Sequence, residues 1–155
     1  MTRVSPLTLG VAESMTCGWI QARVGAVPGA SDFFLGGLTA YQLEQKVRHL
    51  GVDRAHAASV DAVSAVVAEQ MALGACAFFK SDLGLATTGY AEPNPARGVT
   101  APYAFWALAK VRAGEATITH GGRVDCVGAN RVQAQQRVAD VVLSELVKYL
   151  VKLRG

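Results

Sequence analysis

Apolar and polar residues follow one another in blocks along this chain, and the blocks predict strands and helices in turn. Residues 7–13 and 83–88 are short, nearly continuous apolar runs, which are typical of strands buried on both faces of a sheet. Residues 36–42 mix apolar and polar positions and predict a shorter strand. Residues 103–111 and 115–120 flank the turn sequence RAG and predict a β-hairpin.

The segments between these strands are predicted to be helices. Residues 16–24 predict a first helix, with Ser14 or Thr16 as its N-cap. Residues 43–50 predict a second helix, which ends at Gly51 because glycine readily adopts the left-handed conformation that ends helices.

A third, longer helix follows Ser59 or Asp61, either of which suits the N-cap. Its apolar positions keep a helical period: Val63, Val66, Val67, Met71 and Phe78. Residues 89–102 contain three prolines and two glycines and predict a loop. A last helix is expected to start near Asn130 and to bury one stripe: Val138, Val142, Leu146 and Leu150.

The order of these elements predicts an α/β fold in which helices sandwich a mixed sheet. Helical crossovers require parallel strands, and the hairpin adds one antiparallel strand. The length of 155 residues fits a single domain over residues 1–155. Ligands of such sheets bind beyond the carboxyl ends of the strands, where two polar clusters fall, at residues 12–18 and 87–93.

The composition excludes several classes of protein. With 51% apolar and 17% charged residues, the chain is too apolar to be disordered. The apolar stretch 55–79 is interrupted by Asp61, Glu69 and Gln70, so no run of about 20 apolar residues predicts a membrane span. A net charge of +3 suits an anionic small molecule but is too small to indicate nucleic-acid binding.

Cysteine spacing and the absence of several motifs exclude further kinds of site. Cys17, Cys76 and Cys126 lie far apart without a CxxC, so neither a disulfide framework nor a zinc site is expected. HExxH, GxxxxGK[ST] and GxGxxG are also absent. With no signal-peptide pattern at residues 1–10, we expect a cytoplasmic protein without metal or cofactor. Its expected partner is an anionic small molecule, not nucleic acid or membrane, and homo-oligomerisation stays open.

The cluster AESMTCG is the first candidate for chemistry. A strand ends at Glu13, and Thr16, Cys17 and Gly18 are expected to open a helix whose free N–H groups face an anion. Ser14 on this turn would be a nucleophile beside an oxyanion hole made by those N–H groups. The alternative is that Ser14 only caps the helix.

A general base for Ser14 is available in the segment AYQLEQK, where Tyr41 follows a strand and Lys46 lies about one helical turn later. A lysine serves as a base when desolvation brings its pKa from about 10.4 toward 7–8. The alternative is that Lys46 is solvated on a helix surface. Cys17 is a rival nucleophile, because helix N-termini favour the thiolate. Cysteine-based hydrolysis usually needs a histidine, however, and no motif surrounds the three histidines.

Taken together, these motifs resemble the CinA C-terminal domain family. AESMTCG (12–18) is similar to the family's AESCTGG, and VPGAS (27–31) followed by AYQLEQKVRHLGV (40–52) resembles its next segment. TTGYAEP (87–93) resembles the family's strand followed by TGIAGP. The resemblance spans nearly the whole chain in the right order.

The resemblance implies a three-layer α/β/α sandwich with a five-stranded mixed sheet. It also implies nicotinamide mononucleotide deamidase activity, in which the nicotinamide amide is hydrolysed to a carboxylate with release of ammonia. Ser14 and Lys46 match the family's reacting residues, and Tyr41 is expected beside them in the catalytic set.

Substrate binding is assigned from the same clusters and motifs. Thr88 matches a polar site residue of the family, and the GGR of Arg123, followed by Arg131, resembles a GDR…R pair before the final helix. The resemblance makes Arg131 the arginine on the phosphate side. The complete expected set is Glu13, Thr88, Gly89, Arg123 and Arg131.

The third motif is divergent. Glu92 stands where the family has glycine, and the following segment NPARGVTAPY is shorter than the family's glycine-rich loop. Pointing inward, Glu92 would repel a phosphate-bearing substrate, whereas pointing outward into solvent or pairing with Arg97 would largely remove that penalty. The alternative to an amidohydrolase is therefore a non-catalytic nucleotide-binding module of the same fold.

Overall fold

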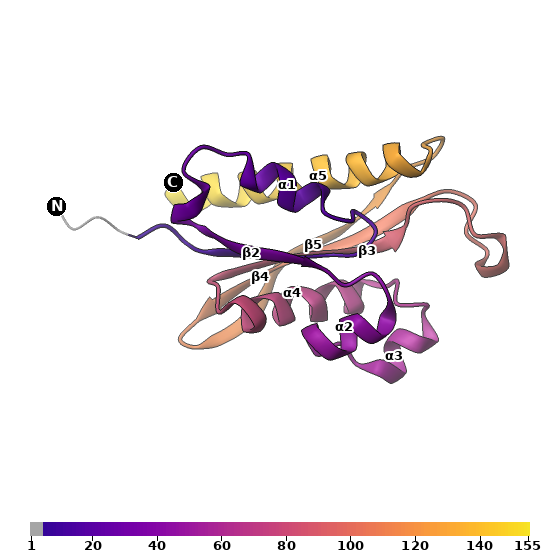
Figure 1. Ribbon diagram of the computed structural model, residues 1–155, viewed down its shortest axis with the longest axis horizontal. Helices are drawn as coiled ribbons and strands as arrows, with labels where there is room; N and C mark the ends of the chain where they lie inside the picture. The colour runs from indigo at the N-terminus through magenta and orange to yellow at the C-terminus, as the bar shows by residue number, and fades with distance from the viewer. Residues whose placement is uncertain (1–4) are drawn as a thin grey trace.

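A computed structural model describes residues 5–155, which form three layers (Figure 1). The central layer is a five-stranded sheet of order β2-β1-β3-β4-β5. Its strands are β1 (Leu9–Glu13), β2 (Phe34–Thr39), β3 (Leu83–Tyr90), β4 (Tyr103–Arg112) and β5 (Glu115–Asp125). β1 pairs in parallel with β2 and β3, whereas β4 runs antiparallel to β3 and β5. The predicted mixed sheet with one antiparallel strand is confirmed.

Helices cover both faces of this sheet. The elements above it in Figure 1 are α1 (Trp19–Gly25) and α5 (Arg131–Arg154). Those below it are α2 (Leu43–Leu50), α3 (Arg54–Ser59) and α4 (Ala65–Phe79). The α/β/α sandwich is therefore confirmed. Every residue of β1 is buried, as expected for a central strand with helices on both sides.

Two glycines allow close stacking of α2, α4 and β3. A Cβ atom at Gly84 would lie 2.2 Å from the carbonyl oxygen of Ala72 in α4. A Cβ atom at Gly74 would lie 2.1 Å from the carbonyl oxygen of Leu50 in α2. Since no other residue fits these contacts, the glycines fix the position of α2, and with it Lys46, relative to the sheet.

The first helix begins later than the pattern predicts. α1 starts at Trp19, and neither Ser14 nor Thr16 is its N-cap. Cys17 and Gly18 have φ angles of 47° and 99°, so a left-handed turn separates β1 from the helix.

The start of α4 also differs from the prediction, because its N-cap is Ser64 and not Ser59 or Asp61. Asp61 and Ala62 have φ angles of 53° and 57°, which interrupt any helix at this point. The Ser64 Oγ accepts the N–H of Val67 at 3.1 Å.

The short helix α3 was not predicted by the hydrophobic pattern, since six residues are too few to show a helical period. Its available signal is Asp53, whose carboxylate caps the helix by accepting the N–H of His56 at 3.1 Å.

The hairpin and the last helix agree with the sequence. Ala113 and Gly114 have φ angles of 50° and 78°, as the tight turn between β4 and β5 requires. β5 continues to Asp125, beyond the predicted residues 115–120. Asn130 caps α5 with both hydrogen bonds of a capping box. Within residues 5–155, no helix is both long and apolar enough to cross a membrane.

Candidate active site

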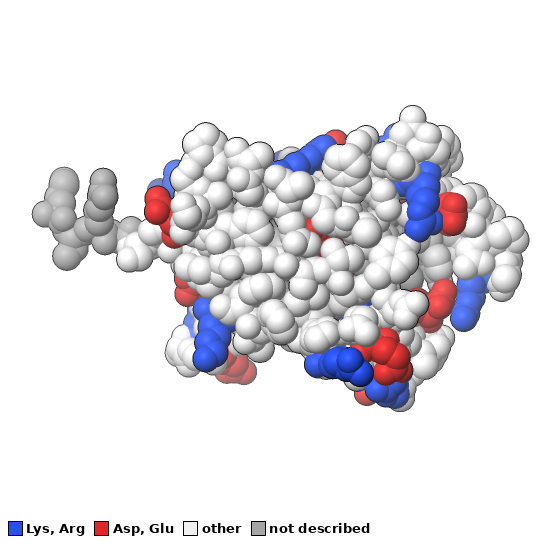
Figure 2. Space-filling view, viewed as in Figure 1, with Lys and Arg blue, Asp and Glu red and all other residues white. Residues whose placement is uncertain are grey.

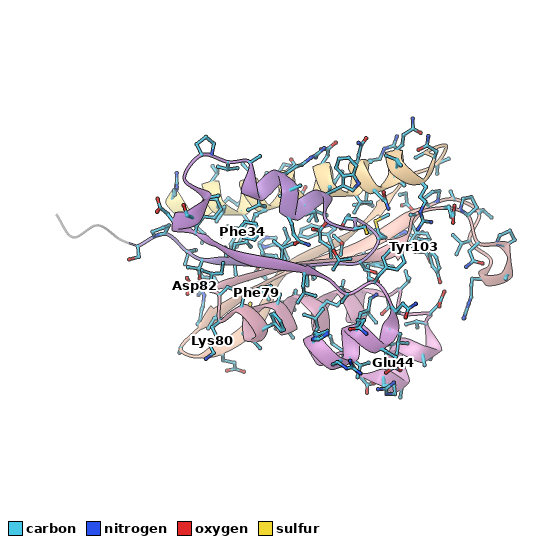
Figure 3. The ribbon with its side chains drawn as sticks, in the orientation of Figure 1. Phe34, Glu44, Phe79, Lys80, Asp82 and Tyr103 are labelled. Carbon is cyan, nitrogen blue, oxygen red and sulfur yellow. The ribbon has the colours of Figure 1, made fainter. Side chains whose placement is uncertain are left out.

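A cavity of about 490 Å³ opens at the end of the sheet where β1 and β3 finish, as the topology predicts. Tyr103 lies at this end, whereas Phe79 and Asp82 lie at the opposite end (Figure 3). Six of the predicted site residues line the cavity: Ser14, Tyr41, Lys46, Thr88, Gly89 and Arg131.

Ser14 and Lys46 are in direct contact. Ser14 follows β1, and Lys46 extends from α2 so that its Nζ donates a hydrogen bond to the Ser14 Oγ at 2.9 Å. Lys46 is 2% exposed and Ser14 is 5% exposed. Lys46 is therefore not a solvated helix residue, and Ser14 is not a helix cap.

Two carbonyl groups complete the surroundings of the Lys46 ammonium. Nζ also donates to the carbonyl oxygens of Ala40 at 2.8 Å and Tyr41 at 2.7 Å. Burial lowers the pKa of Lys46 from 10.5 to about 8, while the charge of Asp61 opposes that shift. When Lys46 is neutral, the two carbonyls hold its N–H groups, and the lone pair faces Ser14.

Tyr41 contributes its two ends to different parts of the site. Its carbonyl oxygen accepts from Lys46 and lies 3.5 Å from the Ser14 Oγ. Its half-exposed side chain reaches the cavity mouth, where the hydroxyl accepts a hydrogen bond from the Arg131 Nη2. Tyr41 therefore connects the base to the mouth of the cavity.

Thr88 and Gly89 form the wall provided by β3. The Thr88 hydroxyl donates to the carbonyl oxygen of Ala62 at 2.6 Å, so it holds the left-handed turn before α4. A Cβ atom at Gly89 would lie 2.4 Å from the carbonyl oxygen of Tyr103, so glycine is required there by the close approach of β4.

Glu13 does not reach the cavity, so the prediction that it binds substrate is wrong. Its carboxylate is 0% exposed and accepts the N–H groups of Ile20 at 2.9 Å and Gln21 at 3.0 Å. Glu13 thus caps α1 from the preceding strand and neutralises the helix N-terminus.

Thr16, Cys17 and Gly18, which were predicted to form an oxyanion hole, do not line the cavity, and that role stays a prediction. The Thr16 hydroxyl pairs with that of Thr87 at 2.8 Å, and the Cys17 N–H donates to the carbonyl oxygen of Ser14 at 3.0 Å. Cys17 is exposed and lies outside the cavity lining.

Arg131 lies at the mouth, at the start of α5, and holds Glu92. Its Nη1 lies 2.8 Å from the Glu92 Oε1. Arg97, the expected partner of Glu92, instead pairs with Asp61: its Nη2 lies 3.5 Å from the Asp61 Oδ1. Glu92 is therefore paired, but with the one arginine that lines the cavity among residues 5–155.

Arg123 does not line the cavity, so its contact with substrate stays a prediction. Its guanidinium stacks 3.9 Å from the ring centroid of Tyr103 and pairs with Asp125 at 3.0 Å.

Tyr90 and Asp61 are among the cavity residues that the sequence reasoning missed as site residues. Tyr90 donates its hydroxyl to the Asp61 Oδ2 at 2.9 Å. Burial, and to a smaller extent this hydrogen bond, raises the pKa of Tyr90 to about 12, so the Tyr90 hydroxyl keeps its proton. Tyr90 lies within the TTGYAEP motif, which is a usable signal, whereas Asp61 was assigned only as a helix cap.

Comparison with known proteins agrees with this fold. A CinA-like protein of Chlorobium limicola is 31% identical over 155 residues, covering 100% of this chain and 36% of that protein. A CinA-like protein of Picosynechococcus is 47% identical over 94 residues, covering 61% of this chain and 22% of that protein. The chain thus matches only about a fifth to a third of the length of these relatives.

Solved structures show the same architecture. A competence-damaged protein (CinA) superfamily protein from Enterobacter cloacae is 28% identical with a TM-score of 0.82, covering 93% of this chain and 82% of that one. Competence damage-inducible protein A from Klebsiella pneumoniae is 25% identical with a TM-score of 0.83, covering 94% and 87%. The family model of the CinA C-terminal domain matches residues 1–150, and the chain accordingly belongs to the CinA C-terminal domain family.

Proposed function

We propose that this protein is an amidohydrolase that cleaves a carboxamide to a carboxylate and ammonia. The observation that carries the proposal is the buried contact between the Lys46 Nζ and the Ser14 Oγ at 2.9 Å. A lysine with a pKa of about 8 is neutral in about a tenth of the molecules at pH 7, which supplies a base without a metal. The resemblance to nicotinamide mononucleotide deamidase suggests a nicotinamide carboxamide as substrate.

In the first half-reaction, neutral Lys46 accepts the hydroxyl proton of Ser14 while Oγ bonds to the carboxamide carbon. The carbonyl electron pair moves to oxygen and forms a tetrahedral oxyanion. When this collapses, the C–N bond breaks, and Lys46 returns the proton to the nitrogen, which leaves as ammonia.

In the second half-reaction, a water molecule attacks the ester carbon of the acyl-Ser14. Lys46 accepts a proton from the water and then donates it to the Ser14 Oγ as the ester bond breaks. The product is a carboxylic acid, which releases its remaining proton to solvent and becomes a carboxylate, and the Ser14–Lys46 pair returns to its starting state.

In this proposal, the backbone N–H of Met15 holds the oxyanion. Met15 follows Ser14 directly and lines the cavity with it. Its N–H has no hydrogen-bond acceptor within residues 5–155. One such donor contributes of the order of 10²–10³ in rate. The Met15 N–H takes the role expected of the N-terminus of α1, whose N–H groups at Ile20 and Gln21 are bonded to the Glu13 carboxylate.

The experiment is to incubate the pure protein with nicotinamide mononucleotide, nicotinamide riboside or nicotinamide and to measure ammonia. Ser14→Ala removes the nucleophile and should abolish release. Ser59→Ala is a matched control, because the Ser59 hydroxyl only donates to the carbonyl oxygen of His56 within α3. Release of ammonia that persists in Ser14→Ala would contradict the mechanism, and release from none of the amides would favour a non-catalytic binding module.

A further inference from the structure

The Glu92 carboxylate pairs with the Arg131 guanidinium, and both residues line the cavity. We infer that the cavity takes carboxamides that carry no phosphate group, with Glu92 as the residue that sets this preference. The inference rests on the proposed amide hydrolysis for the reacting group, and it adds which amides are accepted.

The cations of the cavity are already engaged by the protein. Within residues 5–155, the basic residues that line it are Lys46 and Arg131. Lys46 donates to three protein oxygens, two of them carbonyls. The Arg131 guanidinium contacts the carboxylate of Glu92 through Nη1 and the hydroxyl of Tyr41 through Nη2. A phosphate would therefore have to share the Arg131 guanidinium with the Glu92 carboxylate or displace it.

Carboxylates balance the lysine and arginine at this end of the molecule. Glu92 and Asp61 both line the cavity, so the formal charges of its lining cancel. Positive and negative side chains lie next to one another at the end where the loop after β3 projects (Figure 2). Such a mixed surface offers no net attraction to a phosphate dianion, and a displaced Glu92 would repel it at short range.

The backbone restricts how far Glu92 can move away. It lies between Ala91, which is 5% exposed, and Pro93, and a residue before proline is limited to extended conformations. A β-bridge between Asn94 and Val99 closes the following part of the loop on itself. These features restrict the backbone at Glu92, which lines the cavity together with Arg131.

The pair itself is exposed, so its strength is modest. The side chains of Arg131 and Glu92 are 44% and 62% exposed. Exposed pairs are weak, and most of the discrimination comes from repulsion by the remaining carboxylate. We expect a phosphate-bearing amide to bind about tenfold more weakly than its phosphate-free counterpart.

The test compares two ligands that differ only by the phosphate, nicotinamide mononucleotide and nicotinamide riboside. Dissociation constants are measured by calorimetry in a Ser14→Ala background, so that neither ligand is hydrolysed. Glu92→Gln keeps the side-chain length and removes the charge. Glu145→Gln is the matched control, because Glu145 forms a similar exposed pair with Lys148 outside the cavity.

The expected result is tighter binding of the riboside, a preference that shrinks about tenfold in Glu92→Gln and is unchanged in Glu145→Gln. Equal or tighter binding of the mononucleotide, an unchanged preference in Glu92→Gln, or binding of neither ligand would overturn the inference. An ammonia assay separates it from the proposed function. Preferential hydrolysis of the mononucleotide would overturn the inference alone, whereas hydrolysis of neither ligand would contradict the proposed function for both amides.

Discussion

The Lys46 Nζ lies 2.9 Å from the Ser14 Oγ, although 32 positions separate the two residues in the chain. Both follow strands that pair side by side, since β1 and β2 are parallel neighbours in the sheet. Two carbonyl groups direct the remaining ammonium hydrogens, so the third direction of Nζ is fixed toward the hydroxyl. The backbone therefore orients the base before any ligand binds.

The depressed pKa of Lys46 predicts how activity depends on pH. Only neutral Lys46 accepts the Ser14 proton, so kcat/KM should rise with pH and level off above about 8. Below that value the rate should fall about tenfold for each pH unit. Ammonia release between pH 6 and 9.5 checks this, and a profile that is flat across pH 8 would exclude Lys46 as the base.

The same shift predicts a pH dependence of stability. The folded-state pKa of about 8 lies below the ordinary value of 10.5, so between these values the unfolded chain binds more protons. The free energy of unfolding should therefore rise from pH 8 to pH 10.5 by about 3 kcal/mol. Below pH 8 the full cost of burying the charged ammonium is present.

Lys46→Met isolates this contribution, because methionine fills similar space and does not titrate. Urea unfolding of both proteins at several pH values gives the difference, in which the titrations of other groups cancel. We expect the wild type to gain stability relative to Lys46→Met as the pH rises. A difference independent of pH would show that Lys46 is not shifted downward.

The fold was predictable because its main signals are local and agree with one another. The apolar runs of β1 and β3 mark central strands, and the capping box at Asn130 marks the start of α5. The errors fall at positions with left-handed backbone, at Cys17 and Asp61, where propensity favoured a helix and the chain turns instead. Non-glycine residues rarely adopt this conformation, so the sequence carries little warning of it.

Ser14, Lys46 and Thr88 line the cavity as expected, because their motifs lie at the end of a strand or in the helix that follows one. The role of a side chain was not predictable where its hydrogen-bond partner comes from another element of the fold. Glu13 caps α1 although it stands next to the nucleophile, and Glu92 binds Arg131, which lies 39 positions away. These contacts depend on how the layers pack, and no local pattern records them.

Cys17 is expected to be dispensable for activity, although it lies next to the nucleophile's turn. It is exposed and lies outside the cavity lining, and no histidine lines that cavity within residues 5–155. Cys17→Ala should retain at least half of the ammonia release, whereas Ser14→Ala should lose it. Comparable losses in the two variants would reassign the nucleophile.

Glu13→Gln is expected to destabilise the protein although it changes a carboxylate only to an amide. In the wild type, both Glu13 oxygens accept backbone N–H groups, from Ile20 and Gln21, in a fully buried setting. Glutamine has one oxygen and one NH₂ group, so a donor would face a donor and at least one N–H would lose its acceptor. An unsatisfied buried donor costs about 1–3 kcal/mol, and the loss of charge at the helix N-terminus adds to it.

Urea unfolding of Glu13→Gln should therefore show a lower midpoint than the wild type, with an unchanged slope. Glu115→Gln, an exposed position at the start of β5, serves as the control and should move the midpoint little. Equal midpoints for the two variants would show that the Glu13 carboxylate does not hold the helix.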